Sequence, residues 1–255
     1  MLVATVASTA GCVHTPPPVT DKVAQYYSNP PKPKAVKTPA ALAPTVALLK
    51  DPKRAWSIGV PGDSTGNGPD EWVYLLAKDL SAKYDRPVII HNWDIEKNRY
   101  ADTTTIGGGA GAPVTIWNGS ASGKGLTYSF EHREAMLPSR PDLVIVNHGH
   151  NMATPQEARV GAYNLVDWAT NAWDKPPAVA VTLQNPRVDG RAATHAAVVA
   201  ELREQWTGTP VKLIDVEDAY KSAPDVAALV REDGFHPNPK GEVVWAEAVK
   251  RALGV

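Results

Sequence analysis

Strand-like and helix-like segments alternate along this chain from about residue 56 to its last residues. Short apolar runs bounded by glycine, proline or polar residues are typical of buried strands, and the longer stretches between them carry apolar residues at helical spacing. The expected strands cover residues 55–60, 86–93, 143–149, 178–184 and 211–216, and the expected helices cover residues 71–84, 154–173, 192–206 and 239–253. Because this alternation is typical of βαβ units, we expect one three-layer α/β/α domain with a parallel sheet of flavodoxin-like topology.

Two helix starts are signalled with particular clarity. Thr154, Pro155 and Glu157 form an N-cap, a first-turn proline and a capping box. Asn238 and Pro239 form a similar start before the last helix.

A further strand-like segment, residues 113–118 (PVTIWN), follows the glycine-rich segment IGGGAGA. We expect it to be an extra strand within an insertion. The glycine-rich segment lacks the Lys-Ser/Thr pair of a phosphate loop, so it predicts a turn and no nucleotide site.

The first fifty residues differ in composition from the rest. Residues 1–12 (MLVATVASTAGC) are small and apolar up to Cys12, as in the remnant of a bacterial lipoprotein signal with a lipidated cysteine. A terminus with an incidental cysteine is the alternative. Residues 13–50 are rich in proline, lysine and threonine, which favours an extended tether. We therefore expect a folded domain at 51–255 that is secreted or anchored to the cell envelope, with membrane contact only through Cys12.

Charge and cysteine content exclude several classes of function. The 26 basic and 27 acidic residues leave a net charge of -1 without long runs of either sign, so the chain has no electrostatic footprint for nucleic acid. A single cysteine rules out a disulfide within the chain and a thiolate zinc cluster.

Polar residues follow three of the expected strands, at the sheet edge where parallel folds bind ligands, and a fourth polar block precedes the last helix. They are Gly62-Asp63-Ser64, the stretch Asn118–Gly123, Gly149-His150-Asn151, and Asp233-Gly234-Phe235-His236 before the last helix. A serine becomes a nucleophile when a histidine takes its proton and an acid orients that histidine. Asp233 and His236 fit this pairing, with Ser64 as the nucleophile. Gly123 and Asn151, together with the Ser64 backbone N–H, are candidate donors to a developing oxyanion.

These four blocks resemble those of the SGNH (GDSL-type) hydrolases. VPGDST resembles the serine block, NGSASGKG the glycine block, HGHN the G-x-N block and DGFH the D-x-x-H block, all in the family's order over residues 55–255. The resemblance implies the SGNH fold and a serine esterase that needs no cofactor or metal. It also implies a carboxylic ester substrate, such as an O-acetylated carbohydrate or a lipid acyl ester of the cell envelope.

One position departs from the family pattern. Met152 stands where the family usually has Asp after the block asparagine, so the hydrogen bonding that orients the Asn151 loop must differ here.

The same serine also satisfies G-x-S-x-G, the nucleophile elbow of α/β-hydrolases. In that fold several strands precede the serine, and the acid and histidine lie far apart in the chain. Here Ser64 follows the first strand and Asp233 lies three residues before His236, so we expect the match to be incidental.

Several neighbouring residues have open roles. We expect Asp63 to hold the turn rather than to react. Trp117, His148 and His150 are candidate substrate contacts, and a metal pair of the two histidines is disfavoured because no acidic or cysteine ligand is nearby in the sequence. Alternative functions are an acyltransferase, a lipase or a thioesterase on the same fold. Outside the enzymes, the alternative is a catalytically silent envelope or phage structural protein.

Overall fold

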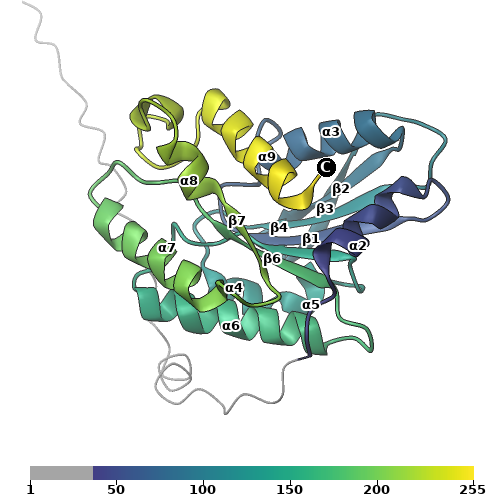
Figure 1. The fold of residues 1–255 in the computed structure, drawn as a ribbon, viewed down its shortest axis with the longest axis horizontal. Coiled ribbons are helices and arrows are strands. Elements are labelled where there is room, and N and C mark those ends of the chain that lie inside the picture. The colour runs from purple at the N-terminus through teal and green to yellow at the C-terminus, as the bar shows by residue number, and fades with distance from the viewer. Residues whose placement is uncertain (1–36) are drawn as a thin grey trace, which may run out of the picture. The chain divides into compact units, whose positions relative to one another are not determined.

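The computed structural model describes residues 37–255, in which seven strands form one sheet with the order β3-β2-β4-β1-β5-β6-β7 (Figure 1). The strands are β1 (Trp56–Gly62), β2 (Val88–Asp94), β3 (Arg99–Ile106), β4 (Val114–Ser120), β5 (Leu143–Val146), β6 (Ala178–Leu183) and β7 (Lys212–Asp215). Only β2 and β3 pair antiparallel, and the other pairs are parallel. The five strands β4-β1-β5-β6-β7, numbered by their own succession along the chain, have the order 2-1-3-4-5 of the flavodoxin-like topology. The predicted fold class is confirmed.

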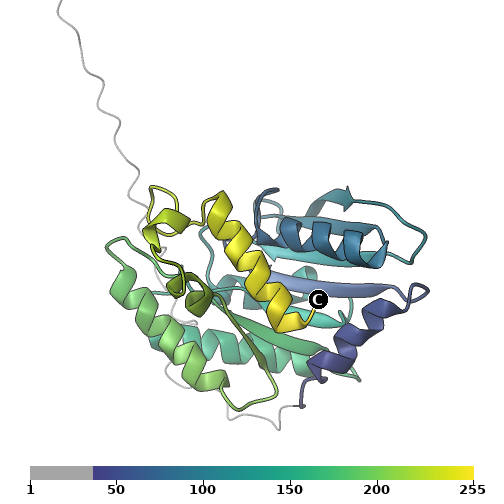
Figure 2. The ribbon, with the colours of Figure 1, turned by 45° about the horizontal axis from the view of Figure 1, so that its top comes forward.

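Helices cover both faces of this sheet (Figures 1 and 2). On one face lie α2 (Leu42–Ala47), α3 (Trp72–Tyr84), α8 (Val216–Lys221) and α9 (Pro239–Leu253), and on the other lie α4 (Leu126–Glu131), α6 (Pro155–Asn171) and α7 (Ala192–Trp206). The helix α5 (Arg133–Met136) follows α4, and short 3-10 turns cover Leu48–Lys50 and Ala227–Leu229. No described helix is long and apolar enough to span a membrane.

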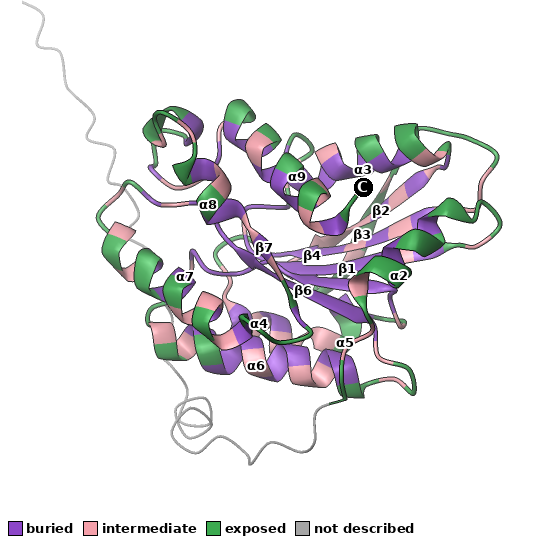
Figure 3. Cartoon of the chain, viewed as in Figure 1, coloured by how far each residue is buried: buried purple, intermediate pink, exposed green. Residues whose placement is uncertain are grey.

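The pattern of buried residues reflects the position of the sheet between two layers of helices. Every residue of β5 and β6 is buried, whereas the helices are buried on the side that faces the sheet and exposed on the other (Figure 3). Continuous apolar runs are what a strand needs when both of its faces are covered. The expected helix caps also form: Thr154 accepts from the Glu157 N–H, and Asn238 accepts from the N–H groups of Lys240 and Gly241.

Residues 113–118 form the expected strand, but the expectation that it lies within an insertion is wrong. The strand β4 lies inside the sheet, where it pairs with β1 from Val114 to Ser120 and with β2 on its other side. The additional strands are β2 and β3 at the edge. The sequence did not predict β3 (RYADTTTI), because an exposed edge strand needs few apolar residues and shows no clear alternation.

The expected end of the tether at residue 50 also needs correction. Val46 and Leu49 are buried in the core beneath α3 and α9, and Thr45 accepts a hydrogen bond at its carbonyl from the Trp56 indole at 3.0 Å. The buried guanidinium of Arg86 donates to the Leu49 carbonyl at 3.1 Å. The apolar segment LAPTVALL therefore belongs to the folded domain. Cys12 and the expected signal remnant lie outside the described residues.

Candidate active site

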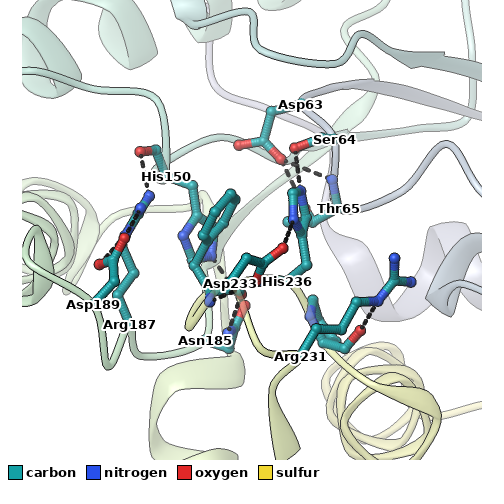
Figure 4. Close-up of polar contacts among 12 residues, drawn as sticks. Asp63, Ser64, Thr65, His150, Asn185, Arg187, Asp189, Arg231, Asp233 and His236 are labelled. Atoms are coloured by element: carbon teal, nitrogen blue, oxygen red, sulfur yellow. Dashed lines mark hydrogen bonds and ion pairs between the residues drawn. The ribbon is translucent and has the colours of Figure 1, made fainter. Parts of the chain in front are cut away.

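The structure brings Ser64, His236 and Asp233 together, although they are separated by up to 172 positions in the chain (Figure 4). Ser64 Oγ lies 2.8 Å from His236 Nε2, and His236 Nδ1 lies 2.7 Å from Asp233 Oδ2. Because the carboxylate accepts the Nδ1 proton, the lone pair of Nε2 is directed at the serine hydroxyl. This is the arrangement in which a histidine can take a proton from serine.

The short sequence DGFH folds into this geometry because its carboxylate caps its own turn. Asp233 Oδ1 accepts hydrogen bonds at 3.0 Å from the backbone N–H groups of Phe235 and His236. Gly234 has a φ of 79°, a conformation that side chains with Cβ rarely adopt. Partial burial opposes ionisation of Asp233, but these hydrogen bonds and that of the His236 ring lower its pKa below the usual value. Asp233 is thus suited to stabilising a charged imidazole.

Asp63 holds the serine turn through hydrogen bonds of its buried carboxylate, as expected. Its carboxylate is fully buried and accepts from the N–H and hydroxyl groups of Thr65 at 3.1 and 2.8 Å and from the Gln184 amide. Burial raises its pKa to about 6, although these hydrogen bonds favour the ionised form. The neighbouring Ser64 is only partly buried, so its hydroxyl is reachable.

The glycine block lies beside the serine turn. The Ala121 N–H donates to the Gly62 carbonyl at 2.9 Å, and the Asn67 amide donates to Ser122 Oγ at 2.9 Å. Gly123 is exposed with a φ of 72°, and no atom lies within 4 Å of the place where a Cβ would stand. The turn thus presents bare backbone next to the nucleophile.

Asn151 reaches the same turn from the end of β5. Its Nδ2 donates one hydrogen bond to the Lys124 carbonyl at 3.0 Å, and the amide carries a second hydrogen. Met152, the departure from the family pattern, is 1% exposed and packs in the core with Leu126 and Ala158. The Asn151 loop is therefore oriented by the Lys124 carbonyl and by apolar packing.

Of the three predicted substrate contacts, the two histidines are buried and the tryptophan is partly exposed. His148 and His150 are each 1% exposed, which does not fit direct contact with a substrate. His148 pairs with Ser129 at 2.8 Å, and burial lowers its pKa to about 3, so it stays neutral. Trp117 is partly exposed, but its ring stacks on His91 of β2 at 4.2 Å. In the described part of the chain, no group of three or more His, Cys, Asp or Glu side chains could hold a metal ion.

Two buried residues at this edge escaped the sequence analysis. Gln184 and Asn185 directly follow β6 and contact the loops that carry Asp63, His150 and Phe235. The rule that selected the other blocks, polar residues directly after a buried strand, would also have selected these two.

Solved structures with the same fold are numerous. A lipase/acylhydrolase from Enterococcus faecalis has 17% identity and a TM-score of 0.58, over 77% of this chain and 94% of the other. A G-D-S-L family member from Veillonella parvula has 16% identity and a TM-score of 0.54, over 78% and 97%. A two-domain esterase active on acetylated mannans has 14% identity and a TM-score of 0.60, over 86% of this chain and 54% of the other. Among curated protein sequences no match was found.

The family comparison covers the whole sheet and the triad loops. Residues 56–249 match the family model for GDSL-like lipases/acylhydrolases. This range begins with β1 and ends in α9, so it includes Ser64, Asp233 and His236. The chain belongs to the GDSL-like lipase/acylhydrolase family of ester-hydrolysing enzymes.

Proposed function

We propose that this protein is a serine esterase that cleaves a carboxylic ester through an acyl-enzyme on Ser64. The observation that carries the proposal is the pair of contacts at 2.8 Å between Ser64 and His236 and at 2.7 Å between His236 and Asp233. A silent structural protein would not need these three side chains in hydrogen-bonding order.

In the acylation step, His236 Nε2 takes the hydroxyl proton while Ser64 Oγ bonds to the ester carbonyl carbon. The carbonyl oxygen becomes an oxyanion, which accepts hydrogen bonds from the Ser64 and Gly123 N–H groups and the free Asn151 amide hydrogen. The C–O bond to the alcohol then breaks, and His236 gives its proton to the leaving alcohol. Water attacks the acyl-serine in the same way and releases the carboxylic acid, with His236 again as base and then acid.

The size of the acyl group distinguishes two substrate classes. A small acyl group indicates an O-acetylated carbohydrate, and a long acyl chain indicates a lipid ester. One structural relative acts on acetylated mannans and another is a lipase/acylhydrolase, which supports an O-acetylated carbohydrate and a lipid ester respectively. Fold alone does not choose between them. Hydrolysis of p-nitrophenyl acetate, butyrate and palmitate tests both the class and the acyl length.

The expected result is turnover of at least one ester, with His236 acting as the base. A rate on acetate that exceeds the rate on palmitate favours the carbohydrate ester. Turnover of none of the three esters, or a rate unaffected by replacing Ser64, would contradict the proposal.

We also propose that Cys12 carries a lipid that anchors the enzyme to the cell envelope. The support is the small apolar sequence before Cys12. Metabolic labelling with a fatty-acid analogue in a bacterial host should mark the wild type and not Cys12→Ser. An unlabelled wild type would reject the anchor.

A further inference from the structure

Gln184 and Asn185 are polar residues with no exposed surface at the edge of the sheet. They directly follow β6, and the mechanism proposed above gives them no part. A buried amide is costly unless each of its polar groups is paired. The partners of these two amides are therefore informative.

Gln184 joins the serine turn to the Asn151 turn. Its Nε2 donates to Asp63 Oδ1 and Oδ2 at 3.2 and 3.1 Å, and its Oε1 accepts from the His150 N–H at 2.7 Å. A side chain at Gly149 would collide with Oε1, since a Cβ there would lie 2.8 Å from it. Asp63 and His150, which directly precede the proposed nucleophile and the proposed oxyanion donor, thus meet at one amide.

Asn185 joins the Asn151 turn to the histidine loop. Its Nδ2 donates to the Phe235 carbonyl at 2.9 Å, and its Oδ1 lies 3.0 Å from His150 Nε2 (Figure 4). The Phe235 carbonyl belongs to the peptide unit that begins His236. Asn185 therefore holds the backbone from which the base projects.

The direction of each hydrogen bond in this chain is fixed. Asp63 as a carboxylate and the Phe235 carbonyl can only accept hydrogen bonds. The Gln184 amide must therefore direct its N–H group toward Asp63, and the Asn185 amide must direct its N–H group toward the Phe235 carbonyl. The two amide oxygens then face His150, which must donate from its backbone N–H and from Nε2. Burial, with His195 and Arg187 nearby, keeps the pKa of His150 well below its usual value, so a neutral ring with the proton on Nε2 completes the chain.

We propose that Gln184 and Asn185 are positioning residues, which hold the turns of Ser64, Asn151 and His236 in register through a single buried hydrogen-bond chain. The proposal rests on the esterase function proposed above. Displacement of a catalytic group by about 1 Å can lower a rate by about 100-fold, which is the scale of effect at issue. Substitution of Asn185 tests the proposal more directly, because its amide donates to the peptide unit that joins Phe235 to His236, the proposed base.

The test compares Asn185→Leu, which keeps the side-chain volume and removes the donor, with Asn185→Ser, which leaves room for water. Asn171→Leu is the control, because Asn171 is an exposed asparagine whose amide contacts are confined to α6. We expect Asn185→Leu to lower kcat by about 10- to 100-fold with KM nearly unchanged. The rate of Ser64 labelling by a fluorophosphonate should fall in parallel. Asn185→Ser should show a smaller loss, and Asn171→Leu none.

Asn185→Ser also carries the test if Asn185→Leu does not fold. A kcat of Asn185→Leu within about threefold of the wild type would overturn the proposal, as would a loss confined to KM. If only Asn185→Ser folds, a kcat equal to that of the wild type would overturn it. The NMR signal of the His236 Nδ1 proton separates this failure from failure of the esterase function. If the wild type neither hydrolyses esters nor reacts at Ser64, a signal that shifts in the Asn185 variants supports positioning, and an unchanged signal contradicts it.

Discussion

Of two substitutions at position 233, Asp233→Asn should give the more stable protein and Asp233→Ala the more active one. Asp233 Oδ1 accepts two backbone N–H groups, and Oδ2 accepts the His236 ring proton. In Asp233→Asn the single oxygen stays with the two backbone donors, which turns the amide N–H₂ toward His236 Nδ1. The ring must then accept at Nδ1 and carry its proton on Nε2, where it cannot take the proton of Ser64.

The expected size of each effect follows from these contacts. The wrong tautomer should lower kcat by about 10³- to 10⁴-fold in Asp233→Asn. The Asp233 side chain is 38% exposed, so in Asp233→Ala water can accept the Nδ1 proton, and this variant should be at least about tenfold more active than the asparagine variant. Alanine forfeits both backbone hydrogen bonds, which costs about 1 kcal/mol at this exposed site and lowers Tm by about 2–4 °C.

The assay is kcat for the preferred p-nitrophenyl ester, measured from pH 5 to 9, with Tm from thermal unfolding. We expect Asp233→Asn to melt near the wild type and yet to be the less active variant, because its histidine has the wrong tautomer. If Asp233→Asn equals or exceeds Asp233→Ala in kcat, the carboxylate does not fix the tautomer of His236, and the reasoning fails.

Three further perturbations probe other parts of the account. Asn151→Ala should lower kcat by about 100- to 1000-fold with little change in KM, as expected for one lost oxyanion donor, and an unchanged kcat would remove Asn151 from that role. Leu49→Ala should cost about 2–5 kcal/mol and lower Tm by about 5–15 °C, with kcat at 25 °C retained, because Leu49 is 1% exposed; an unchanged Tm would mean that this segment contributes no packing. Burial raises the folded-state pKa of Glu242 from 4.5 to about 9, so its contribution to stability is fully present below pH 4.5 and is lost as the pH rises toward 9. Urea unfolding at pH 5, 7 and 9 should show this loss of stability in the wild type and not in Glu242→Gln. The same pH dependence of stability in both proteins would contradict this prediction.

The sequence predicted the parts of the site that local rules govern. Ser64 and Asn151 lie in the loops that follow apolar strands, and the spacing of Asp233 and His236 allows a self-capped turn. Parallel strands bring such loops to one edge, so the fold class and the grouping of Ser64, His236 and Asp233 could be inferred together.

Burial of polar loop residues could not be predicted in the same way. His148 is buried because Ser129 of α4 packs against it, and His150 is buried because Asn185 and the His195 ring enclose it. These partners lie 19 to 45 positions away, and no periodicity connects them to the histidines. The helix α2 was not predicted for the same reason. Its apolar residues follow a proline-rich segment, and their role is visible only from their packing in the core.

Covalent labelling tests whether Ser64 is the nucleophile of an ester-hydrolysing enzyme. Wild-type protein and Ser64→Ala are treated with a fluorophosphonate probe, the modified peptide is identified by mass spectrometry, and ester hydrolysis is measured on the same samples. We expect an adduct on Ser64 in the wild type, no adduct at position 64 in the folded alanine variant, and loss of ester hydrolysis in that variant. Full hydrolysis by Ser64→Ala, or an adduct on another residue that accounts for the activity, would contradict it.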